Sequence, residues 1–174
     1  MDSETGYLRI ATEEAFAPPE LIALWRSMLE DGTCDDPGFI SLPGFYLRSQ
    51  AERPAAILAR LQDLGERRLA DMDAAGIDRQ IVSLTCPGTQ ILDRDRAIAM
   101  ATLANDQLAE ACRKYPDRFT GLTAIAPQDP ENAAGRLSAA RTGSASRASS
   151  STPTPRASTW TTRSSGPYSR PPRP

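Results

Sequence analysis

The fold is decided by residues 66–88, which read ERRLADMDAAGIDRQIVSLTCPG. Apolar residues first recur at helical spacing, beginning with Leu69 and Met72. Gly76 then ends the predicted helix, because glycine adopts the left-handed conformation that closes a helix without strain. The apolar run Gln80–Leu84 follows as a strand, and the Thr-Cys-Pro-Gly sequence behind it is typical of a turn. These residues therefore encode a helix followed directly by a strand.

A similar arrangement is predicted on either side of this stretch. Upstream, a strand is expected over Leu8–Thr12, and Pro18-Pro19 opens a helix that continues over Glu20–Glu30. Downstream, a helix is expected over about residues 93–115 and a strand over Phe119–Ile125. Strands that alternate with helices in this way predict a parallel sheet.

The remaining segments of the front part are less regular. Glycine and proline punctuate Asp35–Arg48, which is predicted as a long loop of the kind that often binds ligands. Ser49–Gly76 is predicted as helical, with Gly65 as the point where the helix can break. A last helix is expected to begin near Asn132.

The predicted fold class is α/β. About three βα units are expected, which suits the N-terminal part of a (β/α)8 TIM barrel, a fold of typically about 250 residues. The expected domain organisation is an incomplete barrel over residues 1–137, followed by a Ser/Pro/Arg-rich tail over residues 138–174.

The tail has a composition unlike the rest of the chain. No Leu, Ile, Val, Met or Phe follows Leu137, and no acid follows Glu131. Such a segment cannot bury enough apolar surface to offset its ordering entropy, so disorder is predicted. One interpretation is a frameshift, because moving the frame back one base in GC-rich codons turns Ser144–Ala148 into Leu-Gly-Phe-Lys-Gly. The alternative is a natural basic tail that binds nucleic acid.

Composition narrows the functional classes. Residues 1–137 contain 14 bases and 22 acids, a charge of −8 that argues against nucleic acid as the partner of the body. No apolar stretch is long enough for a membrane span and the N-terminus lacks a leader, so a cytoplasmic protein is expected. Three cysteines without a CxxC pattern favour reduced thiols. The chain has no His, which excludes histidine triads and histidine metal clusters within it.

The candidate functional residues lie near the carboxyl ends of predicted strands or beside loops. Glu13 can bind a divalent metal through its carboxylate, or be a solvated acid at a helix entry. Thr85 can offer a hydroxyl to a substrate, or cap the end of its strand. Arg53 opens a helix, where a cation opposes the helix dipole, and this indicates an anionic partner or a solvated side chain. Tyr46 and Phe16 can line a pocket or belong to the core.

Four segments of the chain, in order, resemble one known family. They are YLRIATEEAFAPPE, GFISLPGFYLRSQAERPAAILARLQDLGERRLADMDAAGID, SLTCPG and LANDQLAEACRKYPDRFTGLTAIAPQDPENAA, and together they cover nearly all of residues 6–136. The chain resembles the metal-dependent nonoxidative hydroxybenzoate decarboxylases of the amidohydrolase superfamily, and within them the 5-carboxyvanillate branch. Aminocarboxymuconate semialdehyde decarboxylase is a more distant relative of this family.

The resemblance implies a (β/α)8 barrel with one divalent metal ion, Mn²⁺ in preference to Zn²⁺. Glu13 matches the first metal ligand of the family, and Ala15 stands where many relatives carry a His, as in the carboxyvanillate branch. Arg53, Thr85 and Tyr46 match substrate contacts, and Phe16 is a further candidate. The family's later His ligands and its proton-donating Asp are absent, so this chain is expected to hold no catalytic residue and to be inactive by itself.

The activity that the resemblance implies is decarboxylation of an aromatic acid, most closely of 5-carboxyvanillate to vanillate and CO₂, in lignin and aromatic catabolism. The expected partner is a small aromatic carboxylate, with no nucleic acid and no membrane, and the full-length relatives are expected to be homo-oligomers. Two alternatives stay open: a hydrolase of the same superfamily, or a small non-catalytic protein with a basic tail. Assays on a frame-restored protein distinguish the first of these, and the gene sequence around codons 136–144 distinguishes the second.

Overall fold

The computed structural model describes residues 7–135, and residues 1–6 and 136–174 lie outside the described part. Helices and strands alternate broadly as predicted, and residues 130–135 are also helical. The elements, in chain order, are β1 (Ile10–Phe16), α1 (Pro19–Glu30), α2 (Pro37–Arg48), α3 (Glu52–Leu61), α4 (Glu66–Ala75), β2 (Arg79–Leu84), α5 (Arg94–Lys114) and β3 (Phe119–Gly121).

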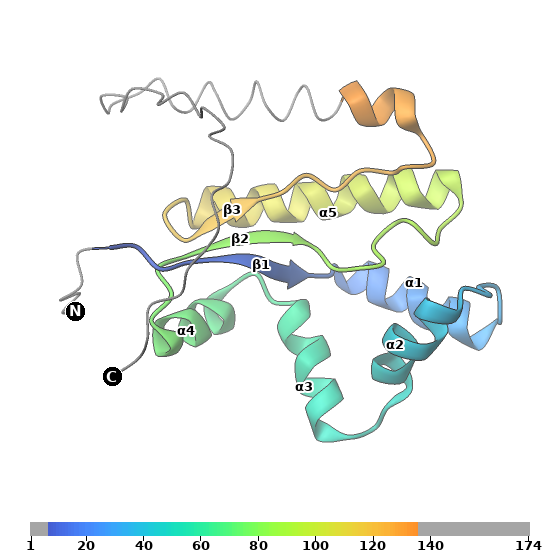
Figure 1. Ribbon diagram of the computed structural model, residues 1–174, viewed down its shortest axis with the longest axis horizontal. Coiled ribbons are helices and arrows are strands. Elements are labelled where there is room, and N and C mark those ends of the chain that lie inside the picture. Colours follow the sequence, from blue (N-terminus) through green and yellow to red (C-terminus); the bar gives the residue numbers. More distant parts are fainter. Residues whose placement is uncertain (1–6, 136–174) are drawn as a thin grey trace, which may run out of the picture.

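The three strands form one parallel sheet in the order β1-β2-β3, as the alternation of helices and strands predicts (Figure 1). Helices α4 and α5 cover one face of this sheet. Their buried side chains, such as Met72 and Leu108, pack with Phe16, Val82 and Phe119 from the strands. A parallel sheet with its helices on one face is the arrangement of a barrel segment. The predicted α/β fold with three βα units is therefore confirmed.

The opposite face of the sheet carries side chains that the described residues leave exposed. Glu13 and Thr120 are exposed, and Leu122 has 51% of its surface accessible. In a closed barrel, this face would point toward the barrel interior. Among residues 7–135, no helix is long and apolar enough to cross a membrane.

A second core lies between α1, α2 and α3. Trp25 of α1 and Phe39 of α2 meet edge to face, with ring centroids 5.8 Å apart, and both are almost fully buried. Leu58 of α3 belongs to the same cluster. These contacts fix α2 beside the carboxyl edge of the sheet, where the candidate residues lie.

The prediction of a loop over Asp35–Arg48 is wrong, because residues 37–48 form helix α2. Pro37 occupies the first turn, where its missing N–H costs nothing. Asp36 caps the helix, since its Oδ1 accepts a hydrogen bond of 2.6 Å from the Phe39 amide. Burial of the Phe39 ring then outweighs the cost of Pro43 inside the helix. Tertiary packing decided this segment, and the composition alone did not reveal it.

The predicted helix over Ser49–Gly76 is two helices, α3 and α4, separated near Gly65 as the sequence allowed. Gly65 is the residue before α4, and its amide donates to Asp63 Oδ1 at 2.7 Å. Gly76 ends α4 with φ of 67°, so its predicted left-handed role is confirmed.

Two strand boundaries differ from their predictions. β1 extends to Phe16, beyond the predicted Leu8–Thr12, because Ala15 and Phe16 pair with β2. A register shift between Ala11 and Glu14 interrupts this pairing. β3 covers Phe119–Gly121 only, three residues of the predicted seven. The predicted domain boundary at residue 137 and the predicted tail lie outside the described residues.

Candidate functional site

The carboxyl end of β2 is the centre of the candidate site. Thr85 and Cys86 follow this strand and line two cavities, of about 240 and 260 Å³. The Thr85 amide donates to the Phe16 carbonyl at 2.8 Å, which joins the ends of β1 and β2. Functional groups of parallel α/β folds gather at this edge.

We call the 240 Å³ space the aromatic cavity, because Trp25 and Tyr46 help to line it. Most of its wall is aliphatic, with side chains from α1, α2 and α3 such as Ile22, Leu47 and Leu61. Tyr46 comes from α2, so the helix that replaces the predicted loop brings Tyr46 and Thr85 to one cavity. An apolar wall with a few hydrogen-bonding groups is typical of a small-molecule site. An apolar cavity of about 150 Å³ already accepts benzene, so one substituted ring suits this volume.

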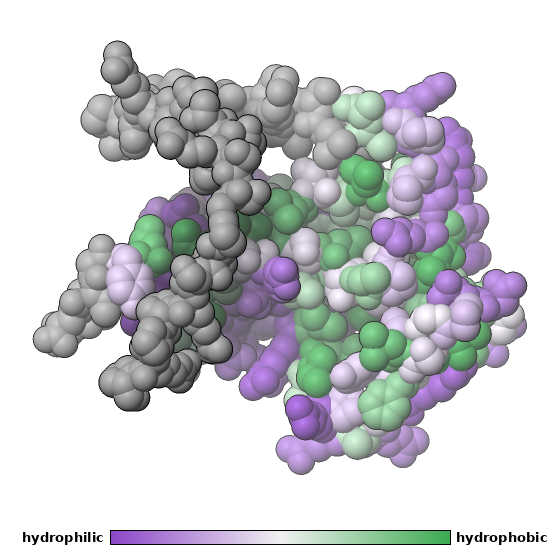
Figure 2. Space-filling view, viewed as in Figure 1, coloured by the Kyte–Doolittle hydropathy of each residue, from purple (hydrophilic) through white to green (hydrophobic). Residues whose placement is uncertain are grey.

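One polar atom of the cavity wall lacks a partner. The indole nitrogen of Trp25 is buried and makes no hydrogen bond within residues 7–135. Beside this wall, α2 exposes Leu42 and Phe45, with accessible fractions of 64% and 59%. Figure 2 shows hydrophobic side chains among polar ones over α2 and α3. The aromatic cavity therefore opens into a partly apolar surface.

The 260 Å³ cavity lies between the loops that follow β2 and β3. Its wall includes Gly88, with φ of 58°, and Ile125. The Thr89 hydroxyl donates to the Ile125 carbonyl at 2.8 Å, and the Gln128 amide donates to the carbonyls of Thr89 and Leu92, each at 2.8 Å. These bonds join the two loops beside Thr85.

Glu13 lies within β1, three residues before its end, and not after the strand as predicted. Its side chain is exposed, whereas Glu14 is half-buried and lines a different cavity with Arg68. Because successive side chains of a strand point to opposite faces, Glu13 lies on the open face of the sheet. Within residues 7–135, no group of three His, Cys, Asp or Glu side chains is placed to hold a metal ion. By itself, Glu13 supplies a single carboxylate ligand.

The structure does not bring the other two predicted residues to these cavities. Arg53 is exposed in the first turn of α3 and lines neither space. Phe16 is 2% exposed and packs with Met72 and Val82 on the covered face of the sheet. Of the two alternatives for Phe16, lining a pocket or belonging to the core, its position fits the core. Phe16 is therefore not proposed below as a substrate contact.

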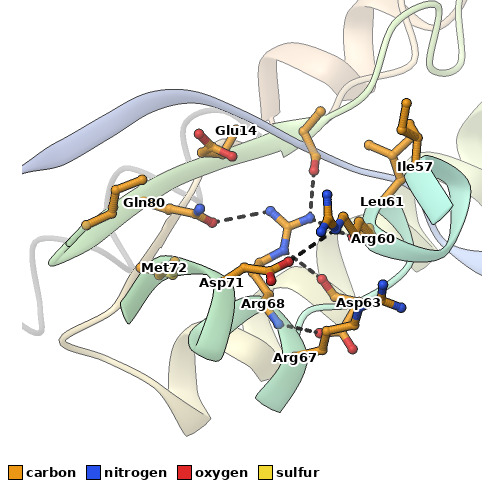
Figure 3. Close-up of a pocket in the computed structure, with 12 residues that line it drawn as sticks. Glu14, Ile57, Arg60, Leu61, Asp63, Arg67, Arg68, Asp71, Met72 and Gln80 are labelled. Atoms are coloured by element: carbon orange, nitrogen blue, oxygen red, sulfur yellow. Dashed lines mark hydrogen bonds and ion pairs between the residues drawn. The ribbon is translucent and has the colours of Figure 1, made fainter. Parts of the chain in front are cut away.

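The sequence analysis did not single out Arg68. Arg68 is 9% exposed and lines a cavity of about 390 Å³ between α3, α4 and the sheet (Figure 3). Its guanidinium donates to the carbonyls of Asp63 (2.7 Å), Ala15 (2.8 Å) and Arg60 (3.2 Å), and to Gln80 Oε1 at 3.3 Å. A signal was present, because Arg68 lies four residues before Met72 and so shares its buried face.

Burial affects the charge of this guanidinium. Desolvation lowers the pKa of Arg68, and the negative charges of Glu14, Asp63 and Asp71 oppose that effect. Arginine nevertheless stays protonated in proteins. The cation is therefore held by a cage of carbonyl oxygens and nearby carboxylates, and it acts as a permanent fixed donor.

The described residues are similar in sequence to known decarboxylases, although no protein-family model matches the chain. Gamma-resorcylate decarboxylase of Rhodococcus jostii is 41% identical over 130 residues, which are 74% of this chain and 33% of the relative. The Rhizobium sp. enzyme of the same name is 39% identical over 130 residues, 34% of its length. The chain thus spans about a third of the length of these curated relatives.

Solved structures give a closer match. A 5-carboxyvanillate decarboxylase from Novosphingobium aromaticivorans, complexed with manganese and 4-hydroxy-3-methoxy-5-nitrobenzoic acid, is 55% identical with a TM-score of 0.76. The similarity covers 81% of this chain and 40% of that one. A 2,6-dihydroxybenzoate decarboxylase from Rhizobium is 37% identical with a TM-score of 0.56, over 75% and 33% of the two chains.

Proposed function

We propose that this chain, which is related by sequence and fold to the hydroxybenzoate decarboxylases of the amidohydrolase superfamily, forms part of the substrate edge of a 5-carboxyvanillate decarboxylase. The reaction would convert 5-carboxyvanillate to vanillate and CO₂. The observation that carries the proposal is the 55% identity to a 5-carboxyvanillate decarboxylase, together with an aromatic cavity lined by Tyr46 and Thr85. In that relative's ligand, the planar nitro group stands in for the carboxylate that leaves as CO₂.

The reaction adds one proton to the ring carbon that bears the carboxylate. The bond between that carbon and the carboxylate then breaks, CO₂ departs, and the bonding electrons restore the aromatic ring. Tyr46 and Thr85 would donate hydrogen bonds to substrate oxygens, and Arg53 would bind a carboxylate through charge-assisted bonds. No described residue is assigned as the proton donor.

A divalent metal, Mn²⁺ in preference to Zn²⁺, would supply Lewis-acid polarisation of the substrate's phenolate and carboxylate oxygens when bound. Glu13 would be one of its ligands, since carboxylate oxygen suits Mn²⁺ and the open face of β1 leaves this side chain accessible. One carboxylate does not make a metal site, and the chain has no His to complete it. The fit is therefore limited to one ligand.

We also propose that residues 138–174 arise from a shifted reading frame and that the 174-residue chain is inactive. The support is the change of composition after Leu137 and the family-like sequence that a one-base shift restores. A cytoplasmic, homo-oligomeric protein is part of this proposal. Cys34, Cys86 and Cys112 form no disulfide, as is usual in a reducing compartment.

The test compares two proteins with Mn²⁺ and 5-carboxyvanillate: the 174-residue chain, and the product of a gene corrected by one base near codons 137–143. The corrected protein is expected to release CO₂ and to form vanillate, and chelation of the metal is expected to abolish this activity. The 174-residue chain is expected to be inert. A corrected protein that is inert on 5-carboxyvanillate, or active without metal, would contradict the proposal. Activity on simple lactones in its place would favour a hydrolase.

A further inference from the structure

We infer that Arg68 is a positioning residue: its buried guanidinium fixes the end of β1 that carries Glu13 against helix α3, which carries Arg53. Naming these two groups as a metal ligand and a substrate contact rests on the proposed function. The link that Arg68 makes between β1 and α3 is argued from its hydrogen bonds and does not depend on the proposed function. Figure 3 shows the guanidinium between the β1 backbone on one side and the α3–α4 connection on the other.

The bonds of Arg68 join the end of β1 to α3 and to the α3–α4 connection. Nη2 donates to the Ala15 carbonyl, two residues beyond Glu13, and to the Arg60 carbonyl in the last turn of α3. Nε donates to the Asp63 carbonyl in the α3–α4 connection. A planar guanidinium holds several acceptors in one fixed geometry, which a lysine ammonium cannot reproduce. Arg68 therefore ties three backbone segments to one rigid group.

The backbone around Arg68 shows the same connection. The Ala17 amide donates to the Leu61 carbonyl at 2.9 Å, so the residue that follows β1 also bonds directly to the last residue of α3. The Thr85 amide donates to the Phe16 carbonyl at 2.8 Å. Displacement of the end of β1 would thus disturb both bonds. It would also move the edge at which Thr85 lines the aromatic cavity.

The charge of Arg68 is required for this role. A buried cation is costly unless hydrogen bonds and opposite charges compensate for its lost hydration. Arg68 has four acceptors, and Glu14 and Asp63 lie close enough to stabilise its charge. Met72, also on α4, lines the same cavity and packs against the sheet with an apolar side chain. A residue at position 68 that served only to fill space could be apolar in the same way. The hydrogen-bond donors of the Arg68 side chain therefore matter more for this role than its volume.

The test uses hydrogen exchange on the metal-free 174-residue chain, so its result does not depend on the proposed activity. In Arg68→Ala, protection of the Ala17 and Thr85 amides is expected to fall by about ten- to a hundred-fold, from the loss of bonds to a charged donor. The amides of Tyr115 and Leu122, which bond to Ala111 and Val82, are expected to keep their protection. Arg67→Ala is the matched control, because Arg67 is an exposed neighbour on α4.

Chemical rescue separates positioning from general stability. The substitution removes the guanidinium beside a 390 Å³ cavity, so millimolar guanidinium ion is expected to enter and restore the protection of Ala17 and Thr85. Tetramethylammonium at equal ionic strength should not restore it. A uniform loss of protection over all four amides, no loss at all, or no rescue by guanidinium would overturn the inference. If Arg68→Ala does not fold, Arg68→Lys is judged by the same pattern of amides.

A Mn²⁺ titration of the frame-corrected protein connects the inference to the proposed function, because the 174-residue chain has only Glu13 as a proposed ligand. Arg68→Ala is expected to weaken Mn²⁺ binding, whereas Arg67→Ala is not. If the frame-corrected protein binds no Mn²⁺, the assignment of Glu13 fails, while the exchange pattern of the 174-residue chain still decides the role of Arg68.

Discussion

Tyr46→Phe is the sharpest test of the aromatic cavity, because it removes one hydroxyl and keeps the ring. The ring meets Phe45 edge to face, with centroids 5.4 Å apart, and helps to wall the cavity, and both features should survive the substitution. Among residues 7–135 the hydroxyl has no hydrogen-bond partner, so the variant should unfold at nearly the same urea concentration. Its effect is therefore expected on ligand binding alone.

The magnitude follows from the charge of the acceptor. A hydrogen bond to a charged group is worth about 1.5–3 kcal/mol, whereas one to a neutral group is worth about 0.5–1.5 kcal/mol. Tyr46→Phe should thus weaken binding of 4-hydroxy-3-methoxy-5-nitrobenzoate by about ten- to a hundred-fold if Tyr46 contacts a carboxylate or phenolate. A loss of only about two- to tenfold would indicate a neutral oxygen.

Trp25 provides the assay, since it lines the same cavity. The chain has two tryptophans, so a Trp160→Phe background leaves Trp25 as the single indole emitter. Quenching of its fluorescence by the nitro ligand then reports occupancy. Phe45→Leu is the matched control, because Phe45 is exposed and does not line the cavity. Equal affinity in Tyr46→Phe and the parent, or an equal loss in Phe45→Leu, would refute the assignment of Tyr46.

Three further outcomes are expected. In the frame-corrected protein, Glu13→Gln should lower metal occupancy and turnover together, while Arg53→Ala should keep the metal and lower kcat/KM by about ten- to a hundred-fold; metal analysis beside kinetics separates the two. Asp36→Ala removes the cap of α2 and should cost about 1 kcal/mol in urea unfolding, with Asp35→Ala as the control. Gly76→Ala should destabilise by about 1–2 kcal/mol or more, because φ is 67° there and a Cβ would meet the Arg9 side chain; a normal thermal midpoint would contradict this.

The sequence predicted the elements whose signals are local. The helix that ends at Gly76, the strand over β2 and the helix capped by Asp93 all follow from periodicity and capping within a few residues. The extents of β1 and β3 did not follow, because pairing with β2 decides where each strand ends. Helix α2 was missed for a related reason, since the burial of Phe39 depends on Trp25, 14 residues earlier in the chain.

The candidate site was predictable to a similar degree. Tyr46 and Thr85 line one cavity, but Tyr46 does so from helix α2, which the sequence did not predict, and their role as substrate contacts stays a prediction. Phe16 shows that a large aromatic beside a loop can equally belong to the core. Arg68 was missed because charged residues usually lie on the protein surface. Arg68 is nevertheless buried, because it lies four residues before Met72 and both residues belong to the buried face of α4.

The different exposures of the four proposed ligand contacts have a common physical cause. Tyr46 and Thr85 carry neutral hydroxyls, which can lie against an apolar cavity at modest cost before any ligand arrives. Glu13 and Arg53 carry full charges, and burying either without a partner would cost far more. Both therefore remain solvated within the described residues, on the open sheet face and in the first turn of α3. Arg68 is the exception that supports this reasoning, because it is buried only together with its four acceptors. The fold can therefore position the neutral hydroxyls of Tyr46 and Thr85 before a ligand binds. The charged groups of Glu13 and Arg53 are compensated only when a metal ion or a carboxylate binds. In the role we infer for Arg68, its buried cation holds β1 and α3, the elements that carry these two charged groups, in place before that binding.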